Sequence, residues 1–389
     1  MSWIPSKANF DTKQYQILTD ILDDANHSWW LQGYAGTGKT MFLIHLIAEY
    51  IEAGWDCAFV TFTHALKNLV IEAMKELGHN PDKLHIETVD GLNTMKLRYD
   101  IIFVDEVQDL TNKQIVKLLE LGDRFVYAGD INQSIFLQAA NSSTIKRALG
   151  DPKIVELTDL YRMPTVIFLA ANIIYPEAEI VLGAKVRKDD NSSFNLVAAE
   201  NIESEVEWVY KRALAESRNQ LPSAILFGKH KDLQEFVKTL ISQLGLPVAP
   251  EVIRNDYDPL NSYLRGKKIK MMYFGGVQGG QLAVASSSKT VLLMTMHNAK
   301  GLEFGSVFTP FMNEGYSLCS YPPMKSNNEW QRRFLYVAIT RAKLNFYASY
   351  SRALNEYLLP LAPENIFEYL LQRGQEQKMK FFHHFHVES

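Results

Sequence analysis

Cysteine is scarce in this sequence, and long hydrophobic runs are absent. The 389 residues include two cysteines, Cys57 and Cys319, which are too few for a disulfide framework or a four-thiolate zinc site. Two buried thiols in a reducing cytoplasm are expected. No run approaches the ~20 apolar residues that cross a bilayer, and the first residues do not resemble a signal peptide. The sequence therefore predicts a soluble cytoplasmic protein without a membrane partner.

An overall excess of positive charge is also missing. Lys and Arg number 40 against 44 Asp and Glu, which gives a formal net charge of −4. This balance excludes the general nucleic-acid binding of a histone or a ribosomal protein, so any nucleic acid would have to bind in local grooves. The chain length is typical of two or three domains, each long enough to bury a core.

Short apolar segments alternate with longer segments of helical periodicity along the chain. Apolar runs at 28–32, 56–61, 101–104 and 125–129 predict strands, and a second series follows at 223–227, 290–295, 306–309 and 344–350. Residues 40–53 predict a helix that stops at Gly54. Such alternation indicates an α/β fold with parallel sheets covered by helices. We expect two domains, 1–158 and 159–389.

A phosphate-binding loop is present near the amino end. Residues Gly33-Tyr-Ala-Gly-Thr-Gly-Lys-Thr40 match G-x-x-x-x-G-K-[ST] between an apolar strand and a helix. Gly33, Gly36 and Gly38 let successive backbone N–H groups point into one concavity, to which the helix N-terminus adds its positive dipole end. Lys39 is predicted to neutralise the β- and γ-phosphates of ATP, and the Thr40 hydroxyl to bind Mg²⁺.

Two carboxylates follow a buried strand downstream of this loop. The run Ile101-Ile-Phe-Val104 leads directly into Asp105 and Glu106. Asp105 is predicted to hold Mg²⁺, and Glu106 to act as the general base for the hydrolytic water. The sequence thus predicts a Mg²⁺-dependent nucleoside triphosphatase.

Five further segments resemble, in order, motifs II to VI of superfamily 1 helicases. The fifth motif ends in Lys-Gly-Leu-Glu-Phe, which is similar to the UvrD/Rep branch, whose members move 3′ to 5′ on single-stranded DNA. The resemblance implies two RecA-like motor cores with ATP in the cleft between them. The segments are Asp105-Glu-Val-Gln-Asp109, Ala128-Gly-Asp-Ile-Asn-Gln-Ser-Ile135, Leu157-Thr-Asp-Leu-Tyr-Arg-Met-Pro164, Thr295-Met-His-Asn-Ala-Lys-Gly-Leu-Glu-Phe304 and Phe334-Leu-Tyr-Val-Ala-Ile-Thr-Arg-Ala-Lys343.

The resemblance also implies roles in ATP binding and hydrolysis. Gln14 is similar to the glutamine that reads adenine, an apt group because an amide both donates and accepts hydrogen bonds. Tyr161 resembles the ring that stacks on the base, and Glu303 the contact on the ribose side. Planar guanidinium groups suit a loose phosphoryl-transfer transition state because they spread charge over several oxygens. The implied γ-phosphate contacts are Gln133, Arg162 and Arg341.

Residues for binding single-stranded DNA are implied in the same way. The segment Thr61-Phe-Thr-His-Ala65 resembles motif Ia, in which hydroxyls hold phosphates and an aromatic ring meets a base. Base stacking contributes ~1–3 kcal/mol per base and tolerates any sequence. Phe62 and Phe136 are the predicted stacking residues, and the backbone contacts are Thr61, Thr63, His64, Thr88 and His297.

Several positions depart from the family pattern. Asp90 stands in Thr88-Val-Asp-Gly91, where a carboxylate would repel phosphates, so it points away or the DNA path differs. Gln138 replaces a second aromatic residue, and Gly228-Lys-His230 replaces a segment with Arg and Asn. The large insertions of UvrD and Rep are missing after Thr88 and reduced at 231–290. The resemblance places the modules that split strands or inhibit the motor in those insertions.

Two other segments contain residue types that occur in binding sites. The glycine-rich stretch 274–281 has no Lys-Ser/Thr ending and is predicted to be a flexible loop. His383, His384 and His386 are predicted to lie in a frayed terminus without a metal.

The function predicted first is an ATP-dependent single-stranded DNA translocase or helicase that moves 3′ to 5′. Trimmed insertions leave a second hypothesis open, namely a motor or switch subunit acting with a nuclease or a replication or repair protein. An RNA motor is a third hypothesis and is less favoured, because no residue here reads a 2′-hydroxyl and the motifs resemble those of DNA enzymes. Unwinding of a 3′-tailed duplex by the isolated protein would separate the first two hypotheses, and competition between DNA and RNA strands for ATPase stimulation would decide the third.

Overall fold

The computed structural model resolves two compact units. It describes residues 6–24, 26–34, 36–130, 134–135, 145–147, 149–157, 160–178, 186–187, 191–218, 221–251, 258–274, 289–319, 321–362 and 381–384. Unit 1 comprises residues Met1–Arg162 with Val181–Lys185, and unit 2 comprises Met163–Ile180 with Val186–Ser389. The predicted domain division at 158 falls four positions before the end of the first segment of unit 1.

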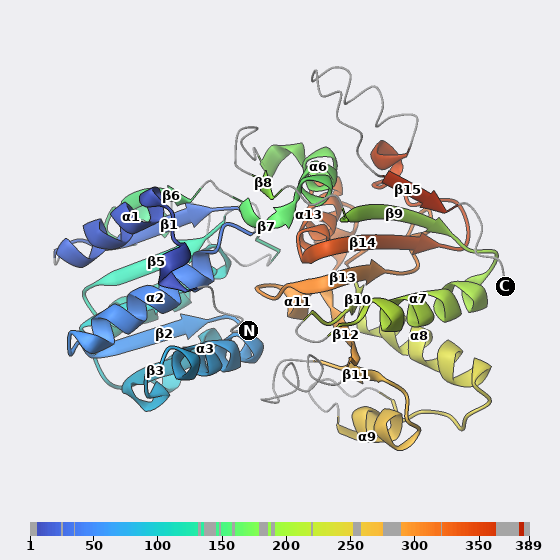
Figure 1. Cartoon of the computed structure of the whole chain (residues 1–389), viewed down its shortest axis with the longest axis horizontal. Helices are drawn as coiled ribbons and strands as arrows, with labels where there is room; N and C mark the ends of the chain where they lie inside the picture. The colour runs from blue at the N-terminus through green and yellow to red at the C-terminus, as the bar shows by residue number, and fades with distance from the viewer. Residues whose placement is uncertain are drawn as a thin grey trace. The chain divides into compact units, whose positions relative to one another are not determined.

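Unit 1 contains a parallel sheet whose described strands run in the order β3-β2-β4-β5-β1-β6 (Figure 1). Every strand pair in it is parallel, so the carboxyl ends of its strands share one edge, where ligands bind in open α/β sheets. The strands are β1 Trp29–Gly33, β2 Cys57–Thr61, β3 Leu84–Thr88, β4 Ile101–Val104, β5 Phe125–Gly129 and β6 Lys153–Leu157.

Helices cover both faces of this sheet because alternate strand residues point to opposite sides. One face packs under α1 (Thr12–Asp23), α2 (Lys39–Glu52) and α3 (His64–Glu76), burying Leu31, Phe59 and Phe103. The other face buries Trp30, Val60 and Tyr127 against α4 (Asn112–Leu121) and the 3-10 helix η3 (Val89–Thr94). The other 3-10 helices in the described part of unit 1 are η1 Lys7–Asn9, η2 Pro81–Lys83 and η4 Val107–Asp109.

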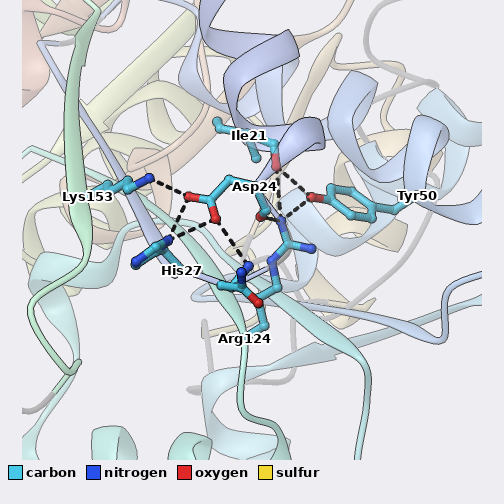
Figure 2. A network of polar contacts seen from close by, with 7 residues as sticks. Ile21, Asp24, His27, Tyr50, Arg124 and Lys153 are labelled. Carbon is cyan, nitrogen blue, oxygen red and sulfur yellow. Dashed lines mark hydrogen bonds and ion pairs between the residues drawn. The ribbon is translucent and has the colours of Figure 1, made fainter.

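A polar network lies at the amino ends of β1, β5 and β6 in unit 1 (Figure 2). The buried Arg124 donates to the carbonyl oxygens of Ile21 and Asp24 and to the Tyr50 hydroxyl. The Asp24 carboxylate accepts a hydrogen bond from Lys153 at 2.7 Å and lies 2.8 Å from His27 Nδ1. These partners hold the pKa of Asp24 well below its usual range, the Lys153 hydrogen bond most strongly. The network joins the end of α1 to three strands.

Unit 2 contains a second sheet, with its described strands in the order β11-β12-β10-β13-β14-β9-β15, all paired in parallel. Alternate residues such as Phe227, Leu293 and Phe308 pack under α7 (Ile202–Glu216) and α8 (His230–Gln243). The strands are β9 Ser193–Ala198, β10 Ala224–Phe227, β11 Met271–Tyr273, β12 Val291–Thr295, β13 Phe304–Thr309, β14 Ala342–Tyr350 and β15 Phe381–His384.

Helices α6 (Thr165–Ile174) and α13 (Asn328–Ile339) contact each other and the strands β9, β13 and β14. Arg333 on α13 donates to the Tyr175 hydroxyl at 2.8 Å and lies over its ring. The described residues also form a separate two-stranded sheet, β7 Leu160–Pro164 with β8 Val186–Arg187. The other helices are α9 Asp258–Gly266, α11 Met296–Ala299, α12 Pro322–Lys325, η6 Pro176–Ala178 and η7 Leu359–Leu361.

All eight strands expected from the sequence are present, with bounds that differ by up to two residues. The predicted helix at 40–53 is α2, and Gly54 after it adopts φ 84°. The expectation of a frayed carboxyl terminus was wrong for His383 and His384, because β15 pairs them with Leu196 and Val197 of β9. His386 and the stretch 275–281 lie outside the described residues.

Within the described ranges, no helix has both the length and the apolarity needed to cross a membrane. Both cysteines are buried free thiols. Burial raises the pKa of Cys57 to about 12, so its unreactive thiol form is favoured.

Candidate nucleotide-binding site

The glycine loop joins the carboxyl end of β1 to the first turn of α2. Gly36 and Gly38 adopt φ 80° and 84°, a left-handed backbone that favours glycine. A Cβ on Gly33 would lie 2.7 Å from the Leu157 carbonyl oxygen and 2.7 Å from Thr37 Oγ1. These three glycines therefore allow a tight loop, followed by a helix of 14 residues whose N-terminus favours anions.

The Lys39 side chain folds back over this loop. Its Nζ donates to the carbonyl oxygens of Gly33 at 2.6 Å and Tyr34 at 3.0 Å. The residue is buried, with 8% exposure. The loop thus holds an ammonium group at the place where the sequence predicts phosphate binding.

The Thr40 hydroxyl contacts the acidic pair that follows β4. Thr40 Oγ1 donates to Asp105 Oδ2 at 2.6 Å, although 65 positions separate them in sequence. Burial raises the pKa of Asp105, and the neighbouring Glu106 carboxylate acts in the same direction. A hydroxyl and a carboxylate oxygen are ligands that suit Mg²⁺, and a cation here would offset the buried negative charge. The residues present therefore fit the metal.

Glu106 lies next to Asp105 in a constrained environment. Its backbone adopts φ 58° and ψ 41°, an uncommon conformation for a residue with a side chain. The residue is buried, and its carboxylate accepts a hydrogen bond from Gln108 Nε2. Sequence reasoning gave Gln108 no role of its own, although the residue belongs to the second motif.

Gln14 is held by the start of α1. Asp11 and Gln14 form a capping box, with Gln14 N donating to Asp11 Oδ1 at 2.8 Å and Asp11 N donating to Gln14 Oε1 at 3.1 Å. Phe10, just before the cap, stacks on Phe42 of α2 with ring centroids 5.6 Å apart. The predicted adenine-reading residue is thereby tied to the helix that carries Lys39.

Two predicted ATP-site residues of unit 2 lie together. Arg341 and Glu303 immediately precede β14 and β13, and Phe304 N donates to the Arg341 carbonyl oxygen at 2.9 Å. The buried Arg341 guanidinium donates to Val337 O at 3.0 Å, and Glu303 pairs with Lys343 at 3.2 Å. Further Arg341 donors reach Leu302 O and Thr340 Oγ1.

Other predicted residues fall where the structure gives no side chain. Tyr161 and Arg162 lie on β7, but their side chains are outside the described part of the chain. Gln133 and Phe136 lie outside the described residues altogether.

The predicted DNA contacts of motif Ia gather at the carboxyl end of β2, at the same edge of the sheet as the glycine loop. Thr61 is fully buried, whereas Phe62 is partly exposed. Thr63 caps α3 by accepting a hydrogen bond from Leu66 N at 3.2 Å, and His64 is exposed in the first turn. The accessible groups of this segment therefore lie at a helix N-terminus, where phosphate is favoured.

Thr88 ends β3 at this same edge, beside a carboxylate. It is buried, and its backbone N–H donates to Glu87 Oε1 at 2.7 Å. Gly91 is close to the same side chain, since a Cβ there would lie 2.5 Å from Glu87 Cδ. Asp90 is exposed on η3. Glu87 thus lies against Thr88 and Gly91, the two residues that flank the segment containing Asp90.

His297 lies on α11, after the carboxyl end of β12 in unit 2. Its ring meets Phe334 edge-on, with centroids 5.0 Å apart. Burial lowers the pKa of His297 to about 4, and the charges of Lys300 and His230 act in the same direction. At neutral pH the imidazole is therefore neutral.

Stability should consequently fall between pH 7 and pH 5. The pKa of His297 in the folded state lies below its unfolded value near 6.5. The stabilisation that the neutral imidazole gives the folded state is therefore complete above the unfolded pKa and is lost as pH falls toward about 4. The expected loss at pH 5 is about 2 kcal/mol. Urea unfolding of the wild type and of His297→Phe, which keeps an aromatic ring, would measure it. Equal pH dependence in the two proteins would contradict this assignment.

Comparison with known proteins places these features in a family. The family model for the UvrD-like helicase C-terminal domain matches residues 62–353, well over half of the chain. The ATP-dependent DNA helicase Rep of Buchnera aphidicola (subspecies Schizaphis graminum) is 38% identical over 106 residues, which cover 25% of this chain and 16% of that protein.

Two further likenesses are longer and weaker. The ATP-dependent DNA helicase UvrD2 of Mycobacterium bovis is 25% identical over 359 residues, covering 69% of this chain and 51% of that protein. A crystal structure of the arterivirus nonstructural protein 10 helicase aligns with 83% of this chain and 59% of its own, at 16% identity and a TM-score of 0.43. The chain thus spans about half or less of the curated helicases it matches here.

Proposed function

Because this chain belongs to the UvrD-like helicase family, we propose that it is an ATP-driven motor on single-stranded DNA that steps 3′ to 5′. The observation that carries the ATPase part is the contact between Thr40 Oγ1 and Asp105 Oδ2 at 2.6 Å, next to a lysine-bearing glycine loop. The names of the relatives Rep and UvrD2, both ATP-dependent DNA helicases, support the DNA part.

In this proposal the loop residues bind the phosphates of ATP, and the acidic residues hold the metal and activate the attacking water. Loop amides and Lys39 bind the β- and γ-phosphates, while Thr40 and Asp105 hold Mg²⁺, which supplies neutralising charge to the phosphate oxygens when bound. The Glu106 carboxylate accepts a proton from the attacking water. On the family resemblance, Gln133, Arg162 and Arg341 contact the γ-phosphate, and the nucleoside contacts are Gln14, Tyr161 and Glu303.

The proposed DNA contacts use the residues at the carboxyl ends of the strands. Phe62 and Phe136 stack on bases, and Thr63, His64 and His297 contact the backbone, with Thr61 and Thr88 supporting the same segments. Stacking and phosphate contacts are independent of base identity, as a motor that moves along any sequence requires. Alternating grip by the two domains predicted at 1–158 and 159–389 would convert hydrolysis into steps.

Single-stranded DNA should raise the ATPase rate at least about tenfold, which corresponds to ~1.4 kcal/mol of the barrier. The expected cause is that DNA bound at the carboxyl ends of the strands favours the arrangement in which the γ-phosphate contacts reach ATP. The measurement is the steady-state ATPase rate with and without an unstructured oligodeoxynucleotide, with an oligoribonucleotide of the same sequence as control. A rate that DNA leaves unchanged would argue against the motor, and a stronger response to RNA would favour the RNA alternative.

A second candidate function follows from the small size of the inserted segments. Between Thr88 and Asp105 the structure holds η3 and strand β4, and the described part of 231–290 holds most of α8, then α9 and β11. This favours a motor or switch subunit that works with a nuclease or another DNA-processing protein and unwinds poorly alone. Strand separation on a 3′-tailed duplex by the isolated protein would overturn this second candidate.

A further inference from the structure

Gln108 is a buried amide for which neither the motif nor the proposed mechanism has a role. It lies on η4, two positions after Glu106, and is 1% exposed. A buried amide is costly unless its donors and its acceptor are paired. Its partners therefore show what the residue is placed to do.

Those partners fix the orientation of the amide. The backbone N–H of Asp130 donates to Gln108 Oε1 at 3.1 Å. Because a backbone N–H needs an acceptor, the oxygen must face Asp130, and the amide nitrogen must then face the other way. Gln108 Nε2 accordingly donates to Glu106 Oε2.

The end of β5 is shaped around this amide. A Cβ on Gly129 would lie 2.2 Å from Gln108 Oε1 and 3.0 Å from Val107 Cγ1. No side chain larger than hydrogen fits at Gly129 unless Gln108 moves. The amide therefore bridges the acidic pair after β4 and the segment after β5, which leads to Gln133 three positions beyond Asp130.

We propose that Gln108 is a positioning residue that orients the Glu106 carboxylate toward the water that attacks ATP. This inference rests on the proposed ATPase function. A hydrogen bond to one carboxylate oxygen fixes the rotation of the group, and the bond to Asp130 N fixes the amide in turn. Since the amide also accepts a hydrogen bond from Asp130 N, it links the general base to the end of β5.

The test replaces Gln108 with Met, which has a similar length but lacks the oxygen and the nitrogen of the amide. We expect kcat for ATP hydrolysis to fall ~10–100-fold, as for other groups that orient a catalytic residue, while nucleotide affinity changes less than about twofold. Gln16→Met, at an exposed position on α1, is the matched control and should leave kcat unchanged. A normal kcat in Gln108→Met would overturn the inference.

A double-mutant cycle separates orientation of Glu106 from a general structural effect. If Gln108 acts through Glu106, adding Gln108→Met to Glu106→Gln should lower the residual rate by less than about twofold. Losses that multiply would overturn the inference. Gln108→Glu serves if the Met variant is unfolded, because it keeps the acceptor for Asp130 N but directs a second carboxylate at Glu106; a normal kcat there would also overturn it.

The ATPase rate of the wild type distinguishes a failure of the proposed function from a failure of the inference about Gln108. A wild-type chain without ATPase activity would overturn the proposed function and this inference together. An active wild type and an inactive Glu106→Gln, beside Gln108 variants with normal kcat, would overturn this inference alone.

Discussion

Replacing Lys39 with alanine is expected to lower ATP hydrolysis at least ~100-fold, equivalent to about 2.7 kcal/mol of transition-state stabilisation. The ammonium lies in the loop between the carbonyl oxygens of Gly33 and Tyr34. There it can move onto phosphate oxygens with little reorganisation, and a methyl group cannot replace its charge. The measurement is single-turnover hydrolysis at saturating ATP, which separates chemistry from binding.

The matched control is Lys113→Ala, an exposed lysine on α4 of the same unit. It removes one positive charge from unit 1 without touching the loop, so its rate should equal that of the wild type. Thermal unfolding of both variants would show that the fold is retained. A near-normal rate in Lys39→Ala would mean that the glycine loop is not the hydrolytic site.

Replacing Arg124 with methionine is expected to lower the free energy of unfolding of unit 1 by about 3 kcal/mol. The guanidinium donates to Ile21 O at 3.0 Å and to the Tyr50 hydroxyl at 2.7 Å, and also to the Asp24 carbonyl oxygen (Figure 2). It also lies 5.2 Å from the centroid of the Tyr50 ring and 5.1 Å from that of Trp55. Methionine fills much of the volume but removes the Arg124 donors from the Asp24 carbonyl oxygen and the Tyr50 hydroxyl oxygen, which is costly in a buried place. The Ile21 carbonyl oxygen keeps the Tyr50 hydroxyl as a donor.

Arg98→Met provides the comparison for this prediction. Arg98 pairs with Asp123 at 2.6 Å, but both side chains are exposed, so its loss should cost under about 1 kcal/mol. Urea unfolding followed by circular dichroism would measure both variants. Equal destabilisation by the two substitutions would show that burial of the Arg124 network contributes nothing beyond an exposed ion pair.

The features that sequence reasoning found are those encoded by neighbouring residues. The conformation of the glycine loop follows from Gly36 and Gly38. The strands predicted from the sequence are largely short buried runs such as β4, which is buried at all four positions. The same reasoning missed β3 and β6. In β3 the buried and exposed positions alternate, and β6 is mostly exposed at the edge of the sheet. The residues of an edge strand carry a weaker apolar signal because one side has no partner strand.

Strand β15 was missed for a related reason. His383 and His384 carry no local signal for a strand, and the pairing comes from β9, nearly 190 positions earlier in the sequence. The bond from Arg333 to Tyr175 depends on how α13 meets α6.

The local groups could be read from the sequence alone: a lysine and a threonine in a glycine loop, two acids after a buried strand, and the order of the motifs that resemble those of superfamily 1 helicases. The tertiary structure decided which of these groups meet. Thr40 and Asp105 are 65 positions apart, Arg124 and Asp24 are 100 apart, and Gln108 binds Asp130 across two strand ends. The reason is that turns and caps follow from local spacing, whereas a contact between strand ends follows from the order and register of the sheet, which no local stretch of sequence contains.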